Sequence, residues 1–535
     1  MRMSVLLSNL CYRLCNMLFS ISPSALLAIV SLFLLAYIVY QRHFHPLSRF
    51  PGPYLASLTN FYRFHHELRG DLPTVLHSAH QKYGPFVRIA PNEVDTNTAE
   101  CIDVVYKKGG RHYLKSDFYD GFTALRPNIF GTRDETHHSL RRRQMAHAFS
   151  HGSLVKMEYI FDRHVKALLD KLDKRAERGK SFHFEDVLRF YSQDCNGDLS
   201  LGIQFRTQEH DDPSLVPPLN DHIALAKLTG YVPWTKPSFD RFGKWLPWPY
   251  LQRLLASRAW MRGEAARVTD LEFRRTGRDK GQISPEEDEE PGRVNLFTGL
   301  VRAKDPDTGE LIERDDVISN AITFLTAGSH SVSSTLEIMW WYLTHYPDIK
   351  KDIQAELDSV IGGIPGTNED IQPFEGLETK LPITNAFFLE TYRLAPTFQH
   401  PAPRMTPPPT SPRFPTIIGD TLIPPNVAIS ASVLSLHRNK DIWGADADEF
   451  KPIRWSRSPA KDNVGLLGHF GWGHRACIGR NQSLIMLWKG MVEVLRRFDV
   501  VVVRGEEERG KRKIKLRVTG FAELAMPLEV RVRRR

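Results

Sequence analysis

Cysteine is scarce in this sequence of 535 residues, which has only Cys11, Cys15, Cys101, Cys195 and Cys477. Two of the five lie within the first fifteen residues, so the rest of the chain is too poor in cysteine to form a disulfide framework. The scarcity indicates that the folded part of the chain lies in a reducing compartment.

Concentrated charge of either sign is also missing. The 71 Lys and Arg residues exceed the 62 Asp and Glu residues to give a net charge of +9, and the tight basic runs are short, at Arg141–Arg143 and Arg533–Arg535. Proteins that bind nucleic acid usually gather their basic residues on one face, so we expect no nucleic-acid partner. A scattered basic excess instead favours an acidic protein partner or an anionic membrane surface.

A long hydrophobic run occurs at the N-terminus. Residues 21–40 read ISPSALLAIVSLFLLAYIVY, without charge and with the length that a helix needs to cross a bilayer. We therefore predict that residues 1–40 are a membrane anchor. The alternative is a cleaved secretory signal, which the absence of a small-residue cleavage site before Gln41 and Arg42 disfavours. Basic residues flank the run almost equally, so the cytosolic placement of the domain depends on the cysteine argument.

Residues 41–53 contain Pro46, Pro51 and Pro53, and we interpret them as a stiff linker that holds the folded part off the membrane. Residues 54–535 alternate long helical patterns with short strand patterns at 86–89 and 498–503, and they show neither an internal repeat nor a clean linker. We expect internal loops at 275–291 and 401–415. The sequence predicts one large domain, mainly α with small β-sheets.

One cysteine lies in an unusual setting, the stretch HFGWGHRACIGR at 469–480. A cysteine that binds metal does so as a thiolate, which needs N–H donors and positive charge nearby. Gly473 and Gly479 allow the tight turn that aims N–H groups at the sulfur of Cys477, and Arg475 supplies the charge. This pattern favours a metal that a large ligand already holds and that needs one axial thiolate, which is haem.

Three alternative roles for Cys477 fit the pattern less well. An iron–sulfur cluster usually needs four cysteines. A zinc site with His469 and His474 lacks a fourth ligand and the usual paired cysteines. A buried structural cysteine is the remaining alternative.

The stretch resembles the F-x-x-G-x-R-x-C-x-G loop of the cytochrome P-450 (P450) haem-thiolate family, at Phe470, Gly473, Arg475, Cys477 and Gly479. Five fixed positions match by accident on the order of once in several thousand chains of this length. The resemblance implies the cytochrome P-450 fold and haem b, iron protoporphyrin IX, with Cys477 as the axial ligand of the iron.

Two further elements of the family follow in the expected order. Glu390 and Arg393 form an E-x-x-R pattern, whose side chains share one helix face; alone it is as well explained by a surface ion pair. Residues 450–455 resemble the family's F-x-P-E-R-F element, with Ile453 in place of its glutamate. Because Arg454 is kept, the resemblance implies a structural triad of Glu390, Arg393 and Arg454.

The resemblance also assigns contacts to the haem propionates. His138 and Arg142 lie where the family's C helix carries an aromatic residue or histidine followed by arginine four residues later. Guanidinium groups bind carboxylates in two-pronged fashion, so we expect propionate contacts from His138, Arg142, Arg404 and Arg475. The alternative for His138 is a surface histidine. Arg141 and Arg143 are interpreted as solvated, or as part of a basic face for a reductase.

Residues 320–345 predict one long buried helix. Within it, residues 327–331, Ala-Gly-Ser-His-Ser, occupy the place of the family's [AG]-G-x-[DE]-T motif, so Ala327 and Gly328 should lie over the haem. His330 replaces the acid and Ser331 the threonine. We hypothesise that both are catalytic residues, Ser331 as the hydroxyl and His330 as the titratable group of a proton relay. The alternative is a local hydrogen bond of His330.

The substrate pocket is predicted only in kind. By family position, residues 118–122, residues 397–399 and Phe521 should line it. Residues 231–250 carry three tryptophans among prolines, which favours contact with the membrane interface and entry of an apolar small molecule from the lipid; an ordinary packed connection is the alternative.

Taken together, the resemblance implies a fungal microsomal type of monooxygenase, a single-pass protein of the endoplasmic reticulum membrane with a cytosolic catalytic domain. Its partners would be NADPH-cytochrome P-450 reductase, which passes on electrons from NADPH, and optionally cytochrome b5. The expected activity inserts one atom of dioxygen into an apolar small molecule of secondary metabolism. Two alternatives remain: an oxygen-independent or peroxide-driven reaction on the same scaffold, and a haem-binding sensor or carrier without turnover.

Overall fold

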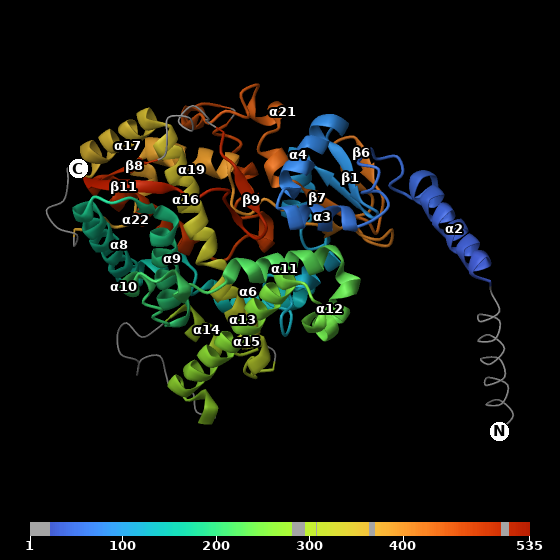
Figure 1. Cartoon of the computed structure of the whole chain (residues 1–535), viewed down its shortest axis with the longest axis horizontal. Helices are drawn as coiled ribbons and strands as arrows, with labels where there is room; N and C mark the ends of the chain where they lie inside the picture. The colour runs from blue at the N-terminus through green and yellow to red at the C-terminus, as the bar shows by residue number, and fades with distance from the viewer. Residues whose placement is uncertain (1–21, 281–294, 306–307, 363–369, 459, 504–512) are drawn as a thin grey trace.

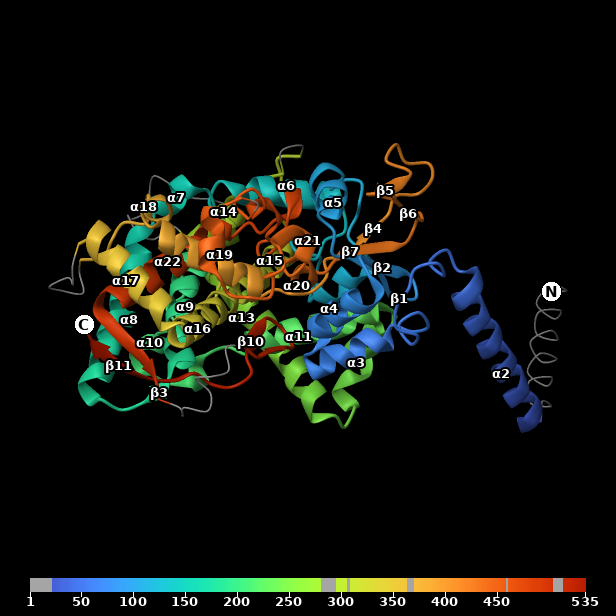
Figure 2. The same cartoon turned by 90° about the horizontal axis from the view of Figure 1, so that it is seen from above.

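The computed structural model describes residues 22–280, 295–305, 308–362, 370–458, 460–503 and 513–535. Most of these residues form helices, which pack into one body with small sheets at two of its sides (Figures 1 and 2). The prediction of a mainly α domain is confirmed.

The apolar run forms helix α2 (Pro23–Val39), which continues into a π-helical turn, η1 (Tyr40–Phe44). Ser22 caps the helix by accepting a hydrogen bond from Ala25 N at 3.2 Å. The helix extends away from the body (Figure 1). Together, α2 and η1 form a helix of 22 residues, Pro23–Phe44, which is long and apolar enough to cross a membrane. It ends four residues later than the predicted span, inside the segment expected to be linker.

The segment predicted to be a linker packs on the domain. Leu47 is fully buried, and Arg88 N donates to Pro51 O at 2.7 Å, so the linker packs on strand β1 (Phe86–Ala90). The Arg88 guanidinium also donates to Gln41 O at 2.7 Å and to Gln41 Oε1 at 2.6 Å. Buried apolar residues and the partners of Arg88 thus bind the segment to the domain.

The strand patterns at 86–89 and 498–503 are confirmed by β1 and by β8 (Phe498–Val502). The sheet nearest α2 has the order β1, β2 (Glu93–Thr96), β7 (Ala428–Ala431), β4 (Arg404–Met405), in which the β2–β7 pair is parallel (Figure 2). The other sheets join β3 (Phe182–His183) and β8 to β11 (Glu529–Arg534), β5 (Thr416–Ile418) to β6 (Thr421–Ile423), and β9 (Leu516–Val518) to β10 (Ala522–Leu524).

The helices fill the rest of the body. Their bounds are α3 (Phe61–Arg69), α4 (Leu72–Tyr83), α5 (Ala99–Cys101), α6 (Glu135–Ala146), α7 (His151–Lys156), α8 (Glu158–Arg178), α9 (Phe184–Leu201), α10 (Thr207–His210), α11 (Leu219–Tyr231), α12 (Lys236–Phe242), α13 (Pro249–Arg275), α14 (Leu296–Arg302), α15 (Arg314–Ala327), α16 (His330–His345), α17 (Pro347–Val360), α18 (Leu377–Lys380), α19 (Pro382–Leu394), α20 (Val433–Leu436), α21 (Lys440–Trp443) and α22 (Arg480–Arg497). Shorter turns are η2 (Ile102–Lys108), η3 (Asp117–Phe122), η4 (Pro213–Leu215), η5 (Pro233–Thr235), η6 (Gly243–Trp245), η7 (Arg278–Lys280), η9 (Pro452–Ser456), η10 (Val464–Leu466) and η11 (Gly473–Arg475).

The largest apolar core lies where α8, α9, α16, α19 and α22 meet. Helix α8 buries residues at helical spacing, such as Phe161, Val165, Leu168 and Leu172, and therefore faces the core with one side. The buried indole ring of Trp488 stacks on Phe388 from α19 at 4.5 Å, which fixes α22 against α19.

The single helix predicted over 320–345 is two helices, because α15 ends at Ala327 and α16 begins at His330. The side chain of Asn196, from α9, lies at the break, where Asn196 Nδ2 donates to Phe324 O at 3.0 Å and to Ser329 Oγ at 2.9 Å. A Cβ at Gly328 would collide with Asn196 Oδ1, so only glycine allows this approach. An inserted side chain that takes over a helix carbonyl is a known cause of a kink.

Candidate active site

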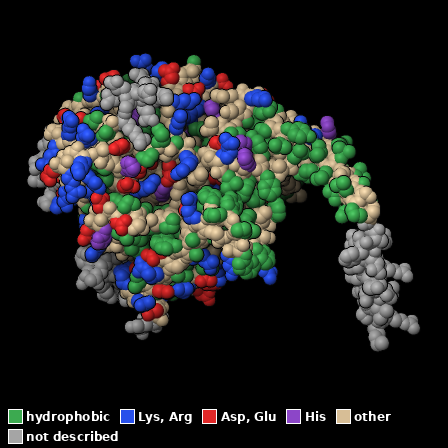
Figure 3. Space-filling model, viewed as in Figure 1, with side chains coloured by type: hydrophobic (Ala, Val, Ile, Leu, Met, Phe, Trp, Pro, Cys, Tyr) green, Lys and Arg blue, Asp and Glu red, His purple; other side chains and the backbone are tan. Residues whose placement is uncertain are grey.

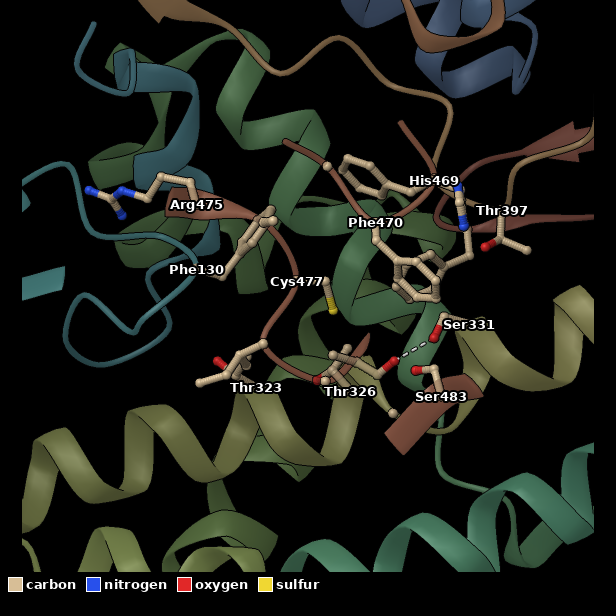
Figure 4. Close-up of a pocket in the computed structure, with 18 of the residues that line it drawn as sticks. Phe130, Thr323, Thr326, Ser331, Thr397, His469, Phe470, Arg475, Cys477 and Ser483 are labelled. Atoms are coloured by element: carbon tan, nitrogen blue, oxygen red, sulfur yellow. Dashed lines mark hydrogen bonds between the residues drawn. The ribbon is translucent and has the colours of Figure 1, made fainter. Parts of the chain in front are cut away.

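A cavity of about 300 Å³ lies between the α15–α16 break and the loop that carries Cys477 (Figure 4). Its wall includes most of the predicted site residues: His138, Arg142, Ala327, Gly328, Ser331, Arg404, Phe470, Arg475, Cys477 and Gly479. Gly473 and His330 lie outside this wall. The structure therefore gathers residues from α6, the α15–α16 break, β4 and the 469–480 loop around one space.

The sulfur of Cys477 points into the cavity, toward Thr326 and Ser331 on the opposite side (Figure 4). Cys477 N donates to Phe470 O at 2.8 Å, which closes the loop. Burial raises the pKa of the Cys477 thiol, while the Gly479 N–H and the positive charges of Arg142 and Arg480 oppose that rise. The N–H donor predicted from Gly479 is thus present, and the sulfur is placed to bind a metal in the cavity.

Gly473 makes the tight turn that the sequence predicts and has a second role. Its φ is +66°, and a Cβ would collide with Tyr106 O, so this position needs glycine for the turn and for the approach of η2. Of the two histidines of the zinc alternative, His474 Nε2 lies 2.7 Å from Glu135 Oε2, and the ring of His469 stacks on Tyr392 at 4.1 Å.

Glu390, Arg393 and Arg454 lie together beneath this loop. Glu390 accepts two hydrogen bonds of 2.9 Å from Arg393 and one of 2.9 Å from Arg454 Nε, and both Glu390 and Arg393 are fully buried. Lys451 N and Trp455 Nε1 also donate hydrogen bonds to the Glu390 carboxylate. Ile453, where the family carries glutamate, is exposed, so the replacement removes nothing from the triad.

Cations gather at one edge of the cavity, and one of them, Lys115, belongs to no motif of the sequence. Lys115 is buried in the wall, where its ammonium lies 4.0 Å from the Tyr119 ring and donates to Phe130 O. No carboxylate among the described residues forms an ion pair with it. Burial and the neighbouring charges of Arg404 and Arg475 lower the pKa of Lys115 well below its usual range. A buried ammonium group without an ion-pair partner is costly, and an anion bound beside it would stabilise its charged form.

The predicted propionate residues occupy the same edge in different ways. Arg404 Nη1 donates to Tyr119 OH at 3.0 Å, and His138 Nδ1 is buried without a hydrogen-bond partner. Arg142 donates to Ala476 O at 2.7 Å, and Arg475 points away from the sulfur toward Glu135 and the Thr132 carbonyl (Figure 4). The unpaired Lys115 and the unpartnered atom of His138 fit the two carboxylates of a haem.

The two residues that depart from the family pattern point in opposite directions. Ser331 faces the cavity, and its hydroxyl donates to Ala327 O at 2.6 Å (Figure 4). The His330 ring lies beside Phe521, with centroids 6.0 Å apart, and His330 Nε2 lies 2.7 Å from Glu523 Oε1 on β10. The structure therefore gives His330 a carboxylate neighbour.

The far side of the cavity is apolar and aromatic. Tyr119, Phe122, Thr397, Phe398 and Phe521 line it, as the predicted pocket segments required. Phe118 instead packs on Tyr231, with ring centroids 5.0 Å apart. Polar groups interrupt this side at Thr397, His400 and His222. His222, from α11, lines the cavity with Nδ1 unpartnered, whereas His400 contacts Lys227 and Tyr231. The pKa of His222 is lowered to about 3, chiefly by burial, so the ring is neutral.

Comparison with known proteins agrees with this geometry. The family model described as "Cytochrome P450" matches residues 50–520. The chain belongs to the cytochrome P450 family. As a family member it binds haem and is a monooxygenase, and the cavity with the Cys477 sulfur, the cationic edge and the broken helix fits that cofactor.

Similar P450 sequences come from fungi. The chain is 28% identical to the benzoate 4-monooxygenase bphA of Aspergillus niger over 96% of this chain and 98% of the relative. It is 24% identical to a pisatin demethylase of Fusarium vanettenii, over 90% and 92%, and 26% identical to the cytochrome P450 monooxygenase cicH of Emericella nidulans, over 86% and 90%. A solved cytochrome P450, CYP102L1, superposes with a TM-score of 0.67 at 18% identity, over 86% and 94%, and supports the fold.

Proposed function

We propose that this P450 inserts one atom of dioxygen into an apolar, membrane-partitioning small molecule of fungal secondary metabolism. NADPH would supply the electrons through NADPH-cytochrome P450 reductase, with cytochrome b5 as an optional second donor. The observation that carries the proposal is the Cys477 sulfur directed into a cavity whose far side is apolar. Haem bound there supplies the chemistry of dioxygen activation, and the chain supplies the ligand, the orientation and the exclusion of water.

Each group at the site has a role in this proposal. Cys477 would hold the haem iron through its thiolate. His138, Arg142, Arg404 and Arg475, together with Lys115, would bind the propionates. For Arg475, this contact requires the guanidinium to share its donors between a propionate and Glu135. Ser331 holds a proton at its hydroxyl on the cavity side, and His330 holds one on the other side of α16.

The relatives support the class of substrate. One relative is named for the oxidation of benzoate and another for the demethylation of pisatin. In this chain, the neutral ring of His222 offers an unpartnered Nδ1 on the largely aromatic side of the cavity, so we propose an aromatic or otherwise apolar substrate with one hydrogen-bonding group directed to α11.

We also propose that residues 1–40 anchor the protein in the endoplasmic reticulum membrane as a single-pass segment, with the domain from residue 54 onward in the cytosol. Apolar side chains gather over α12 and its neighbours as well as on α2 (Figure 3). Trp234, Trp245 and Phe242 are exposed by 69%, 66% and 47%, which supports contact of residues 231–250 with the membrane interface.

The spectrum of the reduced, carbon-monoxide-treated protein tests the proposal. We expect absorption at the long wavelength typical of thiolate ligation, its loss in Cys477→Ala and its retention in Cys101→Ala, a buried cysteine remote from the cavity. Retention in Cys477→Ala would contradict the assignment. Product formation is then measured with and without NADPH and reductase. A monooxygenase needs both, a peroxide-driven or oxygen-independent enzyme forms product without them, and a sensor forms no product.

A further inference from the structure

Glu523, on the C-terminal β9–β10 hairpin, lies against the helix position where the family pattern expects an acid. Glu523 Oε1 is 2.7 Å from His330 Nε2, and the two side chains are exposed by only 11% and 10%. The N–H of the ring is not aimed along this line, so the contact is a close and largely buried approach of the two side chains rather than a directed hydrogen bond.

The hairpin that carries Glu523 is fixed at the cavity. Ala522 N donates to Thr397 O at 2.8 Å, and Phe521 N donates to Asn220 Oδ1 at 2.8 Å. Phe521 lines the cavity while the next but one residue, Glu523, reaches His330, so one short strand contacts both the substrate side and the back of α16. Glu523 is therefore held in place independently of His330.

Other charged groups face Glu523 from each element packed around it. Arg189 of α9 lies 3.8 Å away and Arg517 of β9 lies 3.6 Å away, and Arg517 is 63% exposed. Two further carboxyl groups lie in this region, Glu185 of α9 and Glu337 of α16, and burial raises the pKa of Glu337 to about 8, so Glu337 is mostly uncharged near neutral pH. Burial alone would raise the pKa of Glu523, but His330 and the two arginines lower it to about 2, so Glu523 is ionised near neutral pH.

We propose that Glu523 is a positioning residue of the active site, whose carboxylate holds the ring of His330 where the family pattern places an acid on the helix itself. The usual arrangement is thereby exchanged: the imidazole is on α16 and the carboxylate comes from the hairpin. An acid at position 330 would face Glu523 and repel it, which explains why the departure at His330 is tolerated. The exposed Arg517 lies near Glu523 on the outer side, and Ser331, the next residue after His330, faces the cavity.

This inference rests on the proposed monooxygenase function, and two measurements on the haem-loaded full chain test it. The first is a double-mutant cycle on the thermal midpoint with His330→Gln and Glu523→Gln. We expect the thermal midpoint of the double variant to be no lower than that of the less stable single variant, because either change alone removes the contact. Additive losses would overturn the contact. This measurement needs no turnover, so it stands even if the carbon-monoxide spectrum contradicts the proposed function.

The second measurement is the pH profile of NADPH consumption with reductase and without added substrate. In Glu523→Gln the ring of His330 loses its carboxylate neighbour and is no longer held in place, so we expect at least a fivefold loss at pH 7.5 and a changed pH profile. Glu523→Asp should recover activity to within twofold of the parent. Glu337→Gln is the matched control: burial raises the pKa of Glu337 to about 8, so this change removes a carboxyl group but no charge near neutral pH. An unchanged profile in Glu523→Gln, or an equal effect in Glu337→Gln, would overturn the proposal.

Discussion

Asn196 Nδ2 lies 3.0 Å from Phe324 O, a carbonyl that an unbroken helix would offer to the backbone N–H of Gly328. Gln482 of α22 donates to Asn196 Oδ1 at 2.9 Å, so three helices fix this one amide group. The opening of the helix above the Cys477 sulfur is therefore built into the contact between α9 and α15.

Gly328→Ala should be strongly destabilising in the parent and much less so in the Asn196→Ala background. The added methyl group collides with the Asn196 amide, and removal of that amide relieves the collision. Asn196→Ala alone should cost about 1–3 kcal/mol, because it leaves the Phe324 carbonyl without its buried donor. Urea unfolding of the four proteins measures the coupling. Additive effects would show that the two positions do not compete for one space.

Glu390→Gln should destabilise the protein by about 3–5 kcal/mol, because it leaves the buried guanidinium of Arg393 without its counter-charge. The matched control is Lys451→Ala, since Lys451 is half exposed and pairs with Asp446 and Glu449. The control should cost no more than about 1 kcal/mol. The haem content and the thermal midpoint of unfolding are measured for both variants. Equal losses would mean that the triad does not support the loop.

Stability should fall as the pH drops from about 6.5 toward 3, and His437 should account for part of the slope. Gly468 N donates to His437 Nε2 at 2.9 Å, and His437 Nδ1 donates to Arg393 O at 2.9 Å. Burial and the charge of Arg393 lower the pKa of His437 to about 3. Between about pH 6.5 and 3, His437 therefore binds a proton in the unfolded chain but not in the folded chain. The loss is up to about 1.4 kcal/mol per pH unit in this window.

His437→Asn tests the origin of this slope. The variant should be less stable at pH 7 but should show a shallower dependence of its unfolding free energy on pH between 6 and 4. His65→Asn, at an exposed histidine on α3, should keep the parent's slope. An undiminished slope in His437→Asn would assign the acid sensitivity to other buried histidines.

Several features of the fold and site were accessible from sequence because their signals are local. The Cys477 loop, the E-x-x-R pair and the strands at 86–90 and 498–502 each consist of neighbouring residues with a regular spacing. Aromatic segments that line the cavity were found by their position relative to these motifs. Such signals predicted the fold and the centre of the site.

Other features depend on residues that are far apart in the chain. The helix break arises from Asn196 of α9, and the helical pattern around Gly328 gives no sign of it. Lys115 has no motif, and its buried position becomes visible only when β4 and α6 enclose it. Glu523 meets His330 through the packing of a hairpin on α16. The linker likewise looked like a stalk because the contacts of Arg88 with Gln41 lie outside its own pattern.

Bilayer contact of the α12 region can be measured in the full chain reconstituted in vesicles that contain brominated lipid. We expect Trp234→Phe and Trp245→Phe together to remove most of the quenching of tryptophan fluorescence, since both indole rings are exposed and α2 contains no tryptophan. Trp443→Phe, at a buried residue of α21, should leave the quenched fraction unchanged. If the exposed pair proves unquenched, residues 231–250 face water.

In the proposed membrane-bound form, the contacts of Arg88 with Gln41 would set how the folded domain is oriented on the bilayer. A helix turns by about 100° for each residue, so one residue inserted just before Gln41 would rotate the apolar helix about its axis without disturbing the domain. The tilt of the domain, and with it the depth at which lipophilic compounds reach its surface, would thus be determined at one glutamine of the linker.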